Sequence, residues 1–137
     1  MNQLLYVSSA RQGITSEDIA NITLKAMKFN TQHGITGILL HRGGVFLQLL
    51  EGNEATLQDL FESRIKNDGR HSNIVELFNI PAKTRIFDQW SMAFHEISEL
   101  DIKMVNEILS WNKLISNAKE IDNDLILQML ERFKGRI

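Results

Sequence analysis

The feature that most constrains the fold is a short apolar segment, Val45–Leu50, which lies between Gly43-Gly44 and Gly52. Its length, its composition and the glycines at both ends are typical of a buried strand. Gln48 lies in the middle of this segment, and a buried amide without hydrogen-bond partners costs about 1–3 kcal/mol. The segment therefore predicts either a protein group that meets the Gln48 amide or a ligand that carries both donors and acceptors.

Length and composition predict one compact domain. The chain has 137 residues, one proline and no cysteine, so disulfides and thiolate-based metal or redox chemistry are excluded. The net charge of −2 gives no electrostatic reason to bind nucleic acid or an acidic membrane. No apolar run approaches transmembrane length, and the N-terminus leads directly into a strand pattern rather than a signal peptide. We therefore expect a cytoplasmic protein that binds neither nucleic acid nor membranes.

Alternating and helical patterns predict five strands and two helices in the first part of the chain. In order, they are a strand over Leu4–Ser8, a helix over 16–30, strands over Thr36–His41 and Val45–Leu50, a helix over 54–66, and strands over Ile74–Phe78 and Trp90–Phe94. This βαββαββ order is that of ferredoxin-like folds. We therefore predict an α+β fold with a mixed five-stranded sheet and both helices on one face.

The last part of the chain carries a different pattern. Ser98 and Asp101 match a capping box, which marks the start of a helix. Two apolar stripes at helical spacing follow, one over Ile102–Leu109 and one over Leu125–Phe133. Since two helices already cover one face of the sheet, these two should cover the opposite face or a partner chain. We therefore divide the chain into a domain over 1–96 and a helical extension over 97–137.

Three neutral hydrogen-bonding side chains are expected to converge in an apolar pocket. Tyr6 and Gln48 lie on strands that are neighbours in this topology, and Asn30 ends the inward stripe of the first helix. None of the three is a strong acid, base or metal ligand. Two amides and a phenol suit an imide or amide edge, because each amide offers a donor and an acceptor. A phenol beside an aromatic cofactor is also a candidate one-electron donor.

These residues resemble those of the BLUF photoreceptors, blue-light sensors that use flavin. The resemblance covers about residues 3–94, and its specificity lies in an ordered series of segments rather than in any one residue. The matching segments are Leu5–Ala10, Asn30, Gly34–Leu39, Val45–Gly52, Asp68–Asn73 and Trp90–Met92. The chain is therefore identified from its sequence as a candidate member of this family.

The resemblance implies a flavin bound non-covalently between the two early helices, with FAD expected and FMN as the alternative. It implies that Tyr6 is the photo-oxidisable phenol and that Gln48 links this phenol to flavin N5 and O4. Asn30 would hold the O4/N3 edge, and Ile22 and Ile65 would sandwich the ring. Signalling would then follow from a light-driven rearrangement of the hydrogen bonds between Tyr6, Gln48 and the flavin.

Other matched residues concern the far end of the flavin and the relay of the signal. Asp68, Arg70 and His71 match a loop near the ribityl and phosphate end in relatives. Arg70 also suits a phosphate independently, because its guanidinium is a planar and permanently charged donor. Strand alternation places Trp90, Met92 and Phe94 on one face, and the resemblance makes Trp90 and Met92 signal relays without deciding which lies next to the flavin. The chain departs from some relatives at Phe29 and Gly69.

Two other classes of protein remain as alternatives. A regulator or enzyme on a ferredoxin-like scaffold, such as an acylphosphatase, would need a phosphate loop around Arg11, and no convincing loop surrounds that residue. A pure interaction module is the second. Residues 95–137 are too few for a cyclase, diesterase or DNA-binding output. We therefore expect a sensor without enzymatic activity that signals through a separate protein partner or through a homo-oligomer, and we expect Arg64 and Lys66 to form a solvated helix end.

Overall fold

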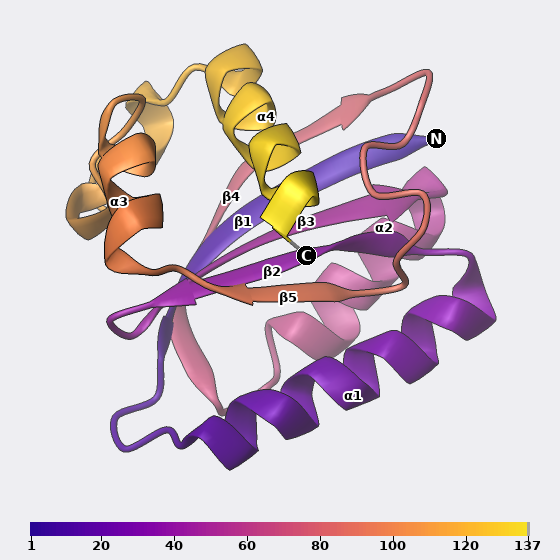
Figure 1. The fold of residues 1–137 in the computed structure, drawn as a ribbon. Coiled ribbons are helices and arrows are strands. Elements are labelled where there is room, and N and C mark those ends of the chain that lie inside the picture. Colours follow the sequence, from indigo (N-terminus) through magenta and orange to yellow (C-terminus); the bar gives the residue numbers. More distant parts are fainter. Residues whose placement is uncertain (137) are drawn as a thin grey trace.

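The computed structural model of the chain describes residues 1–136, which form a five-stranded mixed sheet with helices on both faces (Figure 1). The strands are β1 (Asn2–Ala10), β2 (Thr36–Arg42), β3 (Val45–Gly52), β4 (His71–Pro81) and β5 (Ala93–Glu96). Their order across the sheet is β4-β1-β3-β2-β5, and only the β2–β5 pair is parallel. The predicted α+β ferredoxin-like fold is confirmed.

Four helices cover the sheet in two pairs. α1 (Ser16–His33) and α2 (Glu54–Leu60) lie on one face, and α2 continues into a π-helical turn over Phe61–Ile65. α3 (Glu99–Asn106) and α4 (Asn123–Arg132) lie on the opposite face (Figure 1). Short 3₁₀ turns over Trp111–Lys113, Ala118–Glu120 and Phe133–Arg136 complete the tail.

Local capping chemistry fixes where the helices begin and end. The Thr15 hydroxyl accepts a hydrogen bond from the Asp18 backbone at 3.1 Å, and the Asp18 carboxylate accepts one from the Thr15 backbone at 3.0 Å. This capping box satisfies backbone donors that the first turn of a helix leaves free. Gly34 ends α1 with a φ of 66°, a conformation that glycine adopts without steric cost. The predicted capping box at Ser98 and Asp101 starts α3 in the same way.

The sheet separates two hydrophobic clusters. Alternate side chains of the central strands, such as Leu5, Leu47 and Leu49, pack with the tail helices through Met129 and Leu130, among others. The intervening side chains of the same strands pack instead with α1 and α2; this second cluster includes Leu4, Tyr6, Leu39, Phe46, Leu50, Ile19, Leu57 and Phe61. The two predicted tail helices therefore cover the opposite face of the sheet. Within residues 1–136, no helix has the length and apolar character needed to cross a membrane.

Two strands differ from the predictions at their ends. β4 is longer than the predicted Ile74–Phe78, because it pairs with β1 from His71 to Pro81 and absorbs two register shifts. β5 begins at Ala93, so the predicted strand start at Trp90 is wrong. Residues 87–90 form a turn in which the Trp90 backbone donates to the Phe87 carbonyl at 3.3 Å.

This turn also overturns the expected common face of Trp90, Met92 and Phe94. Period-two alternation does not extend through a turn, so the three side chains separate. Trp90 packs against the cluster on the tail side of the sheet, whereas Met92 and Phe94 belong to the cluster on the α1–α2 side.

The packing of α4 on the sheet predicts a difference between two leucines of one helix. Leu130 is fully buried and Leu125 is 46% exposed. We expect Leu130→Ala to lower the free energy of unfolding by about 2–5 kcal/mol, because it leaves a cavity in the tail-side cluster. Leu125→Ala should change it by less than about 0.5 kcal/mol. Denaturant unfolding measures both, and equal losses would contradict this placement of α4.

Candidate functional site

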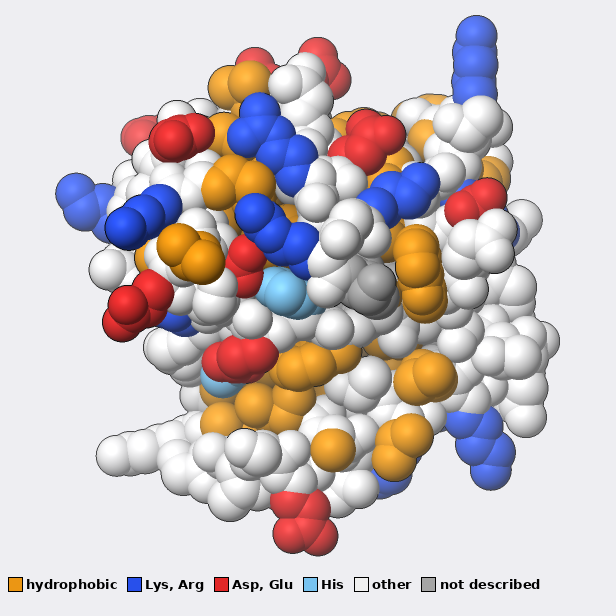
Figure 2. All heavy atoms as spheres, viewed as in Figure 1, with side chains coloured by type: hydrophobic (Ala, Val, Ile, Leu, Met, Phe, Trp, Pro, Cys, Tyr) orange, Lys and Arg blue, Asp and Glu red, His pale blue; other side chains and the backbone are white. Residues whose placement is uncertain are grey.

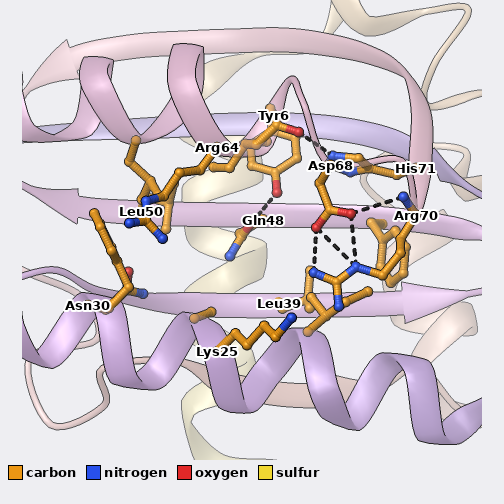
Figure 3. A pocket seen from close by; sticks show the side chains of 16 residues that line it. Tyr6, Lys25, Asn30, Leu39, Gln48, Leu50, Arg64, Asp68, Arg70 and His71 are labelled. Atoms are coloured by element: carbon orange, nitrogen blue, oxygen red, sulfur yellow. Dashed lines mark hydrogen bonds and ion pairs between the residues drawn. The ribbon is translucent and has the colours of Figure 1, made fainter.

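One pocket gathers every binding residue named from the sequence. It lies between α1, the end of α2 and the sheet, and its empty space is about 800 Å³ when the open mouth is included (Figure 3). Its lining includes Tyr6, Ile22, Asn30, Gln48, Ile65, Asp68, Arg70 and His71. The structure thus brings together side chains that are up to 65 positions apart in the chain.

Tyr6 and Gln48 face each other across the two central strands. They are register partners in the antiparallel β1–β3 pair, and both side chains are buried. The Tyr6 hydroxyl donates a hydrogen bond to Gln48 Oε1, and Gln48 Nε2 donates to Met92 Sδ at 3.4 Å. Thioether sulfur is a weak acceptor, and a primary amide has two N–H groups. The Gln48 amide therefore keeps donor capacity for a ligand in the pocket.

Asn30 completes the polar part of the pocket from α1. Its Nδ2 donates to the Ser91 carbonyl at 2.7 Å, and the residue is almost fully buried. Its side-chain oxygen has no hydrogen-bond donor among residues 1–136. The amide is thus anchored by its nitrogen and can offer its oxygen to a ligand. In the same loop, Met92 lies beside Gln48, whereas Trp90 packs with the cluster on the other side of the sheet.

A charged pair lies at the mouth of the pocket. The Arg70 guanidinium binds Asp68 through three hydrogen bonds of 2.6–3.1 Å, and the Arg70 backbone donates to the same carboxylate at 3.0 Å (Figure 3). These bonds from Arg70 hold the pKa of Asp68 below its usual value and raise the pKa of Arg70. Both groups therefore stay charged over the whole physiological pH range.

His71 connects β4 to its surroundings through both ring nitrogens. Nε2 lies 2.6 Å from the Ile65 carbonyl, so this nitrogen must carry the proton and donate. Nδ1 of the neutral ring then accepts from the Ser8 hydroxyl at 3.0 Å. The ring lies edge-on to Tyr6, with centroids 6.2 Å apart. His71 therefore ties the end of the π-helical turn to β1 and supports one side of Tyr6.

Eight further residues line the pocket that sequence reasoning did not assign to it, and among them are Lys25, Phe29 and Arg64. Arg64 is exposed at a helix end, as expected, and its guanidinium also lies 4.2 Å from the centroid of the Phe29 ring. Lys25 and Phe29 follow Ile22 by one and two helical turns, so the inward stripe of α1 already contained the signal. With Arg70, these side chains give the pocket three cations and one carboxylate, a balance that favours an anionic group.

The environment of Tyr6 governs how its hydroxyl can react. Burial raises the pKa of Tyr6 far above its usual value, and the negative charge of Asp68 raises it further. The phenol is therefore protonated throughout the neutral range. Loss of an electron from such a phenol must be accompanied by movement of its proton, and Gln48 Oε1 is the acceptor in place. Residues 1–136 contain no cluster of histidine and carboxylate groups that could hold a metal ion.

Comparison with known proteins gives a family match over most of the chain. The BLUF model, described as sensors of blue light using FAD, matches residues 1–93. The chain is 32% identical over 93 residues to the photoactivated adenylate cyclase subunit beta of Euglena gracilis, covering 67% of this chain and 11% of that protein. It is also 32% identical over 135 residues to the blue light- and temperature-regulated antirepressor BluF of Escherichia coli (strain K12), covering 97% of this chain and 32% of the relative. The chain thus spans about a tenth of the cyclase and a third of the antirepressor.

Solved structures resemble the chain over both the sheet and the tail helices. The photo-activated state of BlsA superimposes with a TM-score of 0.82 at 25% identity, covering 96% of this chain and 94% of that one. The dark state of the BLUF protein BlrB gives a TM-score of 0.75 at 27% identity, with coverage of 98% and 95%. The arrangement of α3 and α4 on the sheet is therefore shared with these proteins.

The burial of Tyr6 predicts an unusual alkaline titration. Tyr6 is the only tyrosine, so the ultraviolet absorbance of tyrosinate reports this side chain alone. In the flavin-free protein we expect no tyrosinate at the ordinary tyrosine pKa of about 10, and its appearance only together with unfolding. The stabilisation due to this raised pKa is complete below pH 10 or so and is lost as the pH rises through the folded pKa. Asp68→Asn should lower the Tyr6 pKa by the smaller, electrostatic contribution, and an ordinary midpoint in the folded wild type would refute the site geometry.

Proposed function

Because this chain belongs to the BLUF family of blue-light sensors that use flavin, we propose that the pocket between α1, α2 and the sheet holds the flavin ring and that Tyr6 and Gln48 carry its light-driven change. The observation that carries this proposal is the buried series of contacts from Tyr6 through Gln48 to Met92, in which Tyr6 and Gln48 line the pocket. It is a hydrogen-bonded system with a protonated phenol at one end and a weak acceptor at the other.

The residues around these two fit a flavin in size and chemistry. Ile22 and Ile65 offer apolar surfaces on opposite sides of the pocket for the two faces of a planar ring. Asn30 and Gln48 offer amides to the O4, N3 and N5 edge. Arg70, with Lys25 and Arg64, suits the phosphate end, while Asp68 can accept hydrogen bonds from ribityl hydroxyls. We propose FAD rather than FMN as the native cofactor.

A bound flavin would supply the absorption of blue light and an acceptor for one electron. The remaining steps belong to this chain's own residues. Tyr6 gives up an electron while its hydroxyl proton moves to Gln48 Oε1. Return of both to Tyr6 leaves the Gln48 amide rotated or tautomerised, and this changes which of its atoms donate and accept. The lit state is therefore a new hydrogen-bond arrangement that decays in the dark.

The proposal makes the protein a sensor rather than a catalyst, acting in the cytoplasm. The enzyme alternative centred on Arg11, but that side chain is exposed, lies 3.7 Å from Asp18 at the start of α1 and does not line the pocket. We place the sensor domain at 1–96 and the output in the extension over 97–137. Leu100, on the outer side of α3, is 76% exposed, and Figure 2 shows hydrophobic side chains among charged ones over the tail. This surface supports docking of a downstream protein or a second copy of the chain.

The photochemical proposal predicts the behaviour of two variants. Tyr6→Phe removes only the hydroxyl, and Gln48→Leu removes only the amide, so both should retain flavin. Each should lose the small, reversible shift of the flavin absorption to longer wavelength after blue light. Gln128→Leu, the same substitution at an exposed position of α4, should keep the shift. A normal shift in Tyr6→Phe or Gln48→Leu would disprove the proposed role of that residue in the light-driven change.

The cofactor proposal predicts selective loss of phosphorylated flavins. Arg70→Ala should weaken the binding of FAD and FMN more than that of riboflavin, because only the first two carry phosphate. Titration of the flavin-free protein with each flavin measures the three dissociation constants, and mass spectrometry of flavin released from the native protein identifies the cofactor. Equal weakening for all three flavins would show that Arg70 does not contact a phosphate.

The output proposal predicts that light alters the tail. We expect the amides of α3 and α4 to exchange hydrogen at different rates in the dark and in the light. The coupling free energy between the pocket and these helices should be about 1–3 kcal/mol. Met92→Ala should leave the spectral shift in place but reduce this difference, since it removes the contact between Gln48 and the loop before β5. Identical exchange in dark and light would mean that the tail is only a structural cover and that output leaves from another surface.

A further inference from the structure

Glu51 is a buried carboxylate with no part in the pocket. It lies three residues after Gln48 in β3 and is fully buried. Its two oxygens accept hydrogen bonds from the backbone N–H groups of Ile86 and Phe87, each at 2.7 Å, and from Gln3 Nε2 at 2.9 Å. A charged group is buried only where donors replace its hydration. Two of these three donors belong to a single loop, so the carboxylate holds that loop in place.

Arg85 holds the same loop from its other side. Its guanidinium donates to the Gly34 carbonyl at 2.8 Å, to the Thr36 hydroxyl at 2.9 Å and to the Glu51 carbonyl at 3.0 Å. These groups lie at the end of α1, the start of β2 and the end of β3. Three consecutive residues, from Arg85 to Phe87, are therefore fixed to one end of the sheet.

The far end of this loop reaches the pocket. The Trp90 carbonyl accepts from the Gly37 backbone at 3.1 Å, and the Ser91 carbonyl accepts from Asn30 Nδ2 at 2.7 Å. The next residue, Met92, accepts the 3.4 Å contact from Gln48. Met92 lies five positions after the Glu51 anchor at Phe87. The Met92 contact is itself weak, because thioether sulfur is a poor acceptor.

The loop also carries apolar side chains that lie on opposite sides of the sheet. Phe87 is fully buried in the tail-side cluster, and Trp90 packs against it with ring centroids 6.2 Å apart. Met92, two residues on, points to the other side of the sheet. The path of the backbone after Phe87 places Trp90 on the tail side of the sheet and Met92 beside Gln48. Since the Met92–Gln48 contact is too weak to fix this alone, stronger bonds must do so.

We propose that Glu51 is a positioning residue that, with Arg85, holds the 86–92 loop so that Met92 rather than Trp90 lies beside Gln48, and that this sets the lifetime of the lit state. The inference rests on the proposed function, because Gln48 is the group whose rearrangement the loop would control. Glu51 acts only through the loop: it lies on the tail side of β3 and does not line the pocket.

Glu51→Gln tests the carboxylate with almost no change of shape. An amide has one oxygen and an NH₂ group, so it cannot accept from both Ile86 and Phe87 through separate oxygens. Loss of one hydrogen bond corresponds to a change of about three- to tenfold in a rate or exchange constant. We expect the variant to keep flavin and the size of the spectral shift, but to change the dark recovery rate by this factor. Arg85→Gln, at a partly exposed position, should change the rate in the same direction.

Two readouts separate positioning from general destabilisation. Hydrogen exchange of the 86–92 amides should rise by about three- to tenfold in both variants. The methyl resonance of Met92, assigned by its absence in Met92→Leu, should move in the dark-state NMR spectrum. Asp101→Asn is the matched control, since it neutralises a second buried carboxylate that binds the Ser98 backbone at the start of α3 and His95 of β5 but does not contact the 86–92 loop. It should leave the recovery rate and the Met92 resonance unchanged.

The outcomes distinguish this inference from the proposed function. If Glu51→Gln loosens the loop while the Met92 resonance and the recovery rate stay as in the wild type, Glu51 is merely structural and the inference fails. It also fails if Asp101→Asn alters recovery as strongly as Glu51→Gln. If the wild type shows no reversible spectral shift, the proposed function fails, and the resonance of Met92 in the dark still reports whether Glu51 positions the loop.

Discussion

The pairing of β1 with β3 at the centre of the sheet is the constraint on which the rest of the structure depends. Both strands are covered on both faces, so each alternate side chain is committed to one of two clusters. The register that places Tyr6 opposite Gln48 also places Leu5 opposite Leu49. A slip of one residue would move the phenol or the amide to the tail side of the sheet. The hydrophobic residues that fill the tail-side cluster thus also keep the two polar groups in the pocket.

Much of the fold follows from local sequence signals. The glycines around Val45–Leu50, the capping residue Thr15 and the spacing of apolar residues in α1 each act over a few positions, and the structure agrees with all of them. The ends of β4 were less predictable, because they depend on pairing with β1 across some seventy positions of the chain. An edge strand continues as far as its neighbour offers hydrogen bonds, whatever its own apolar pattern.

The candidate site could be predicted only in part. Alternation and helical spacing bring Tyr6, Gln48 and Asn30 together, and the family resemblance added the residues around them. The loop before β5 is different, because its path is set by Glu51 and Arg85, which contact backbone groups rather than a matching sequence pattern. Nothing in the alternation of Trp90, Met92 and Phe94 reveals that turn. Arg64 is exposed, as predicted, but its place at the pocket was missed, because an exposed helix end can still line a pocket formed with a distant helix.

The division of the core by the sheet has a consequence for how such a chain can diverge. The two clusters share the backbone of the central strands but not their side chains, so substitutions on the outer surface of α3 and α4, away from the shared strands, should leave the pocket nearly unchanged. The residues on the outer surface of α3 and α4 can therefore change during evolution without changing the geometry of the pocket. Lineages with one conserved light-sensing half and rapidly drifting tails are the evolutionary pattern that this partition favours.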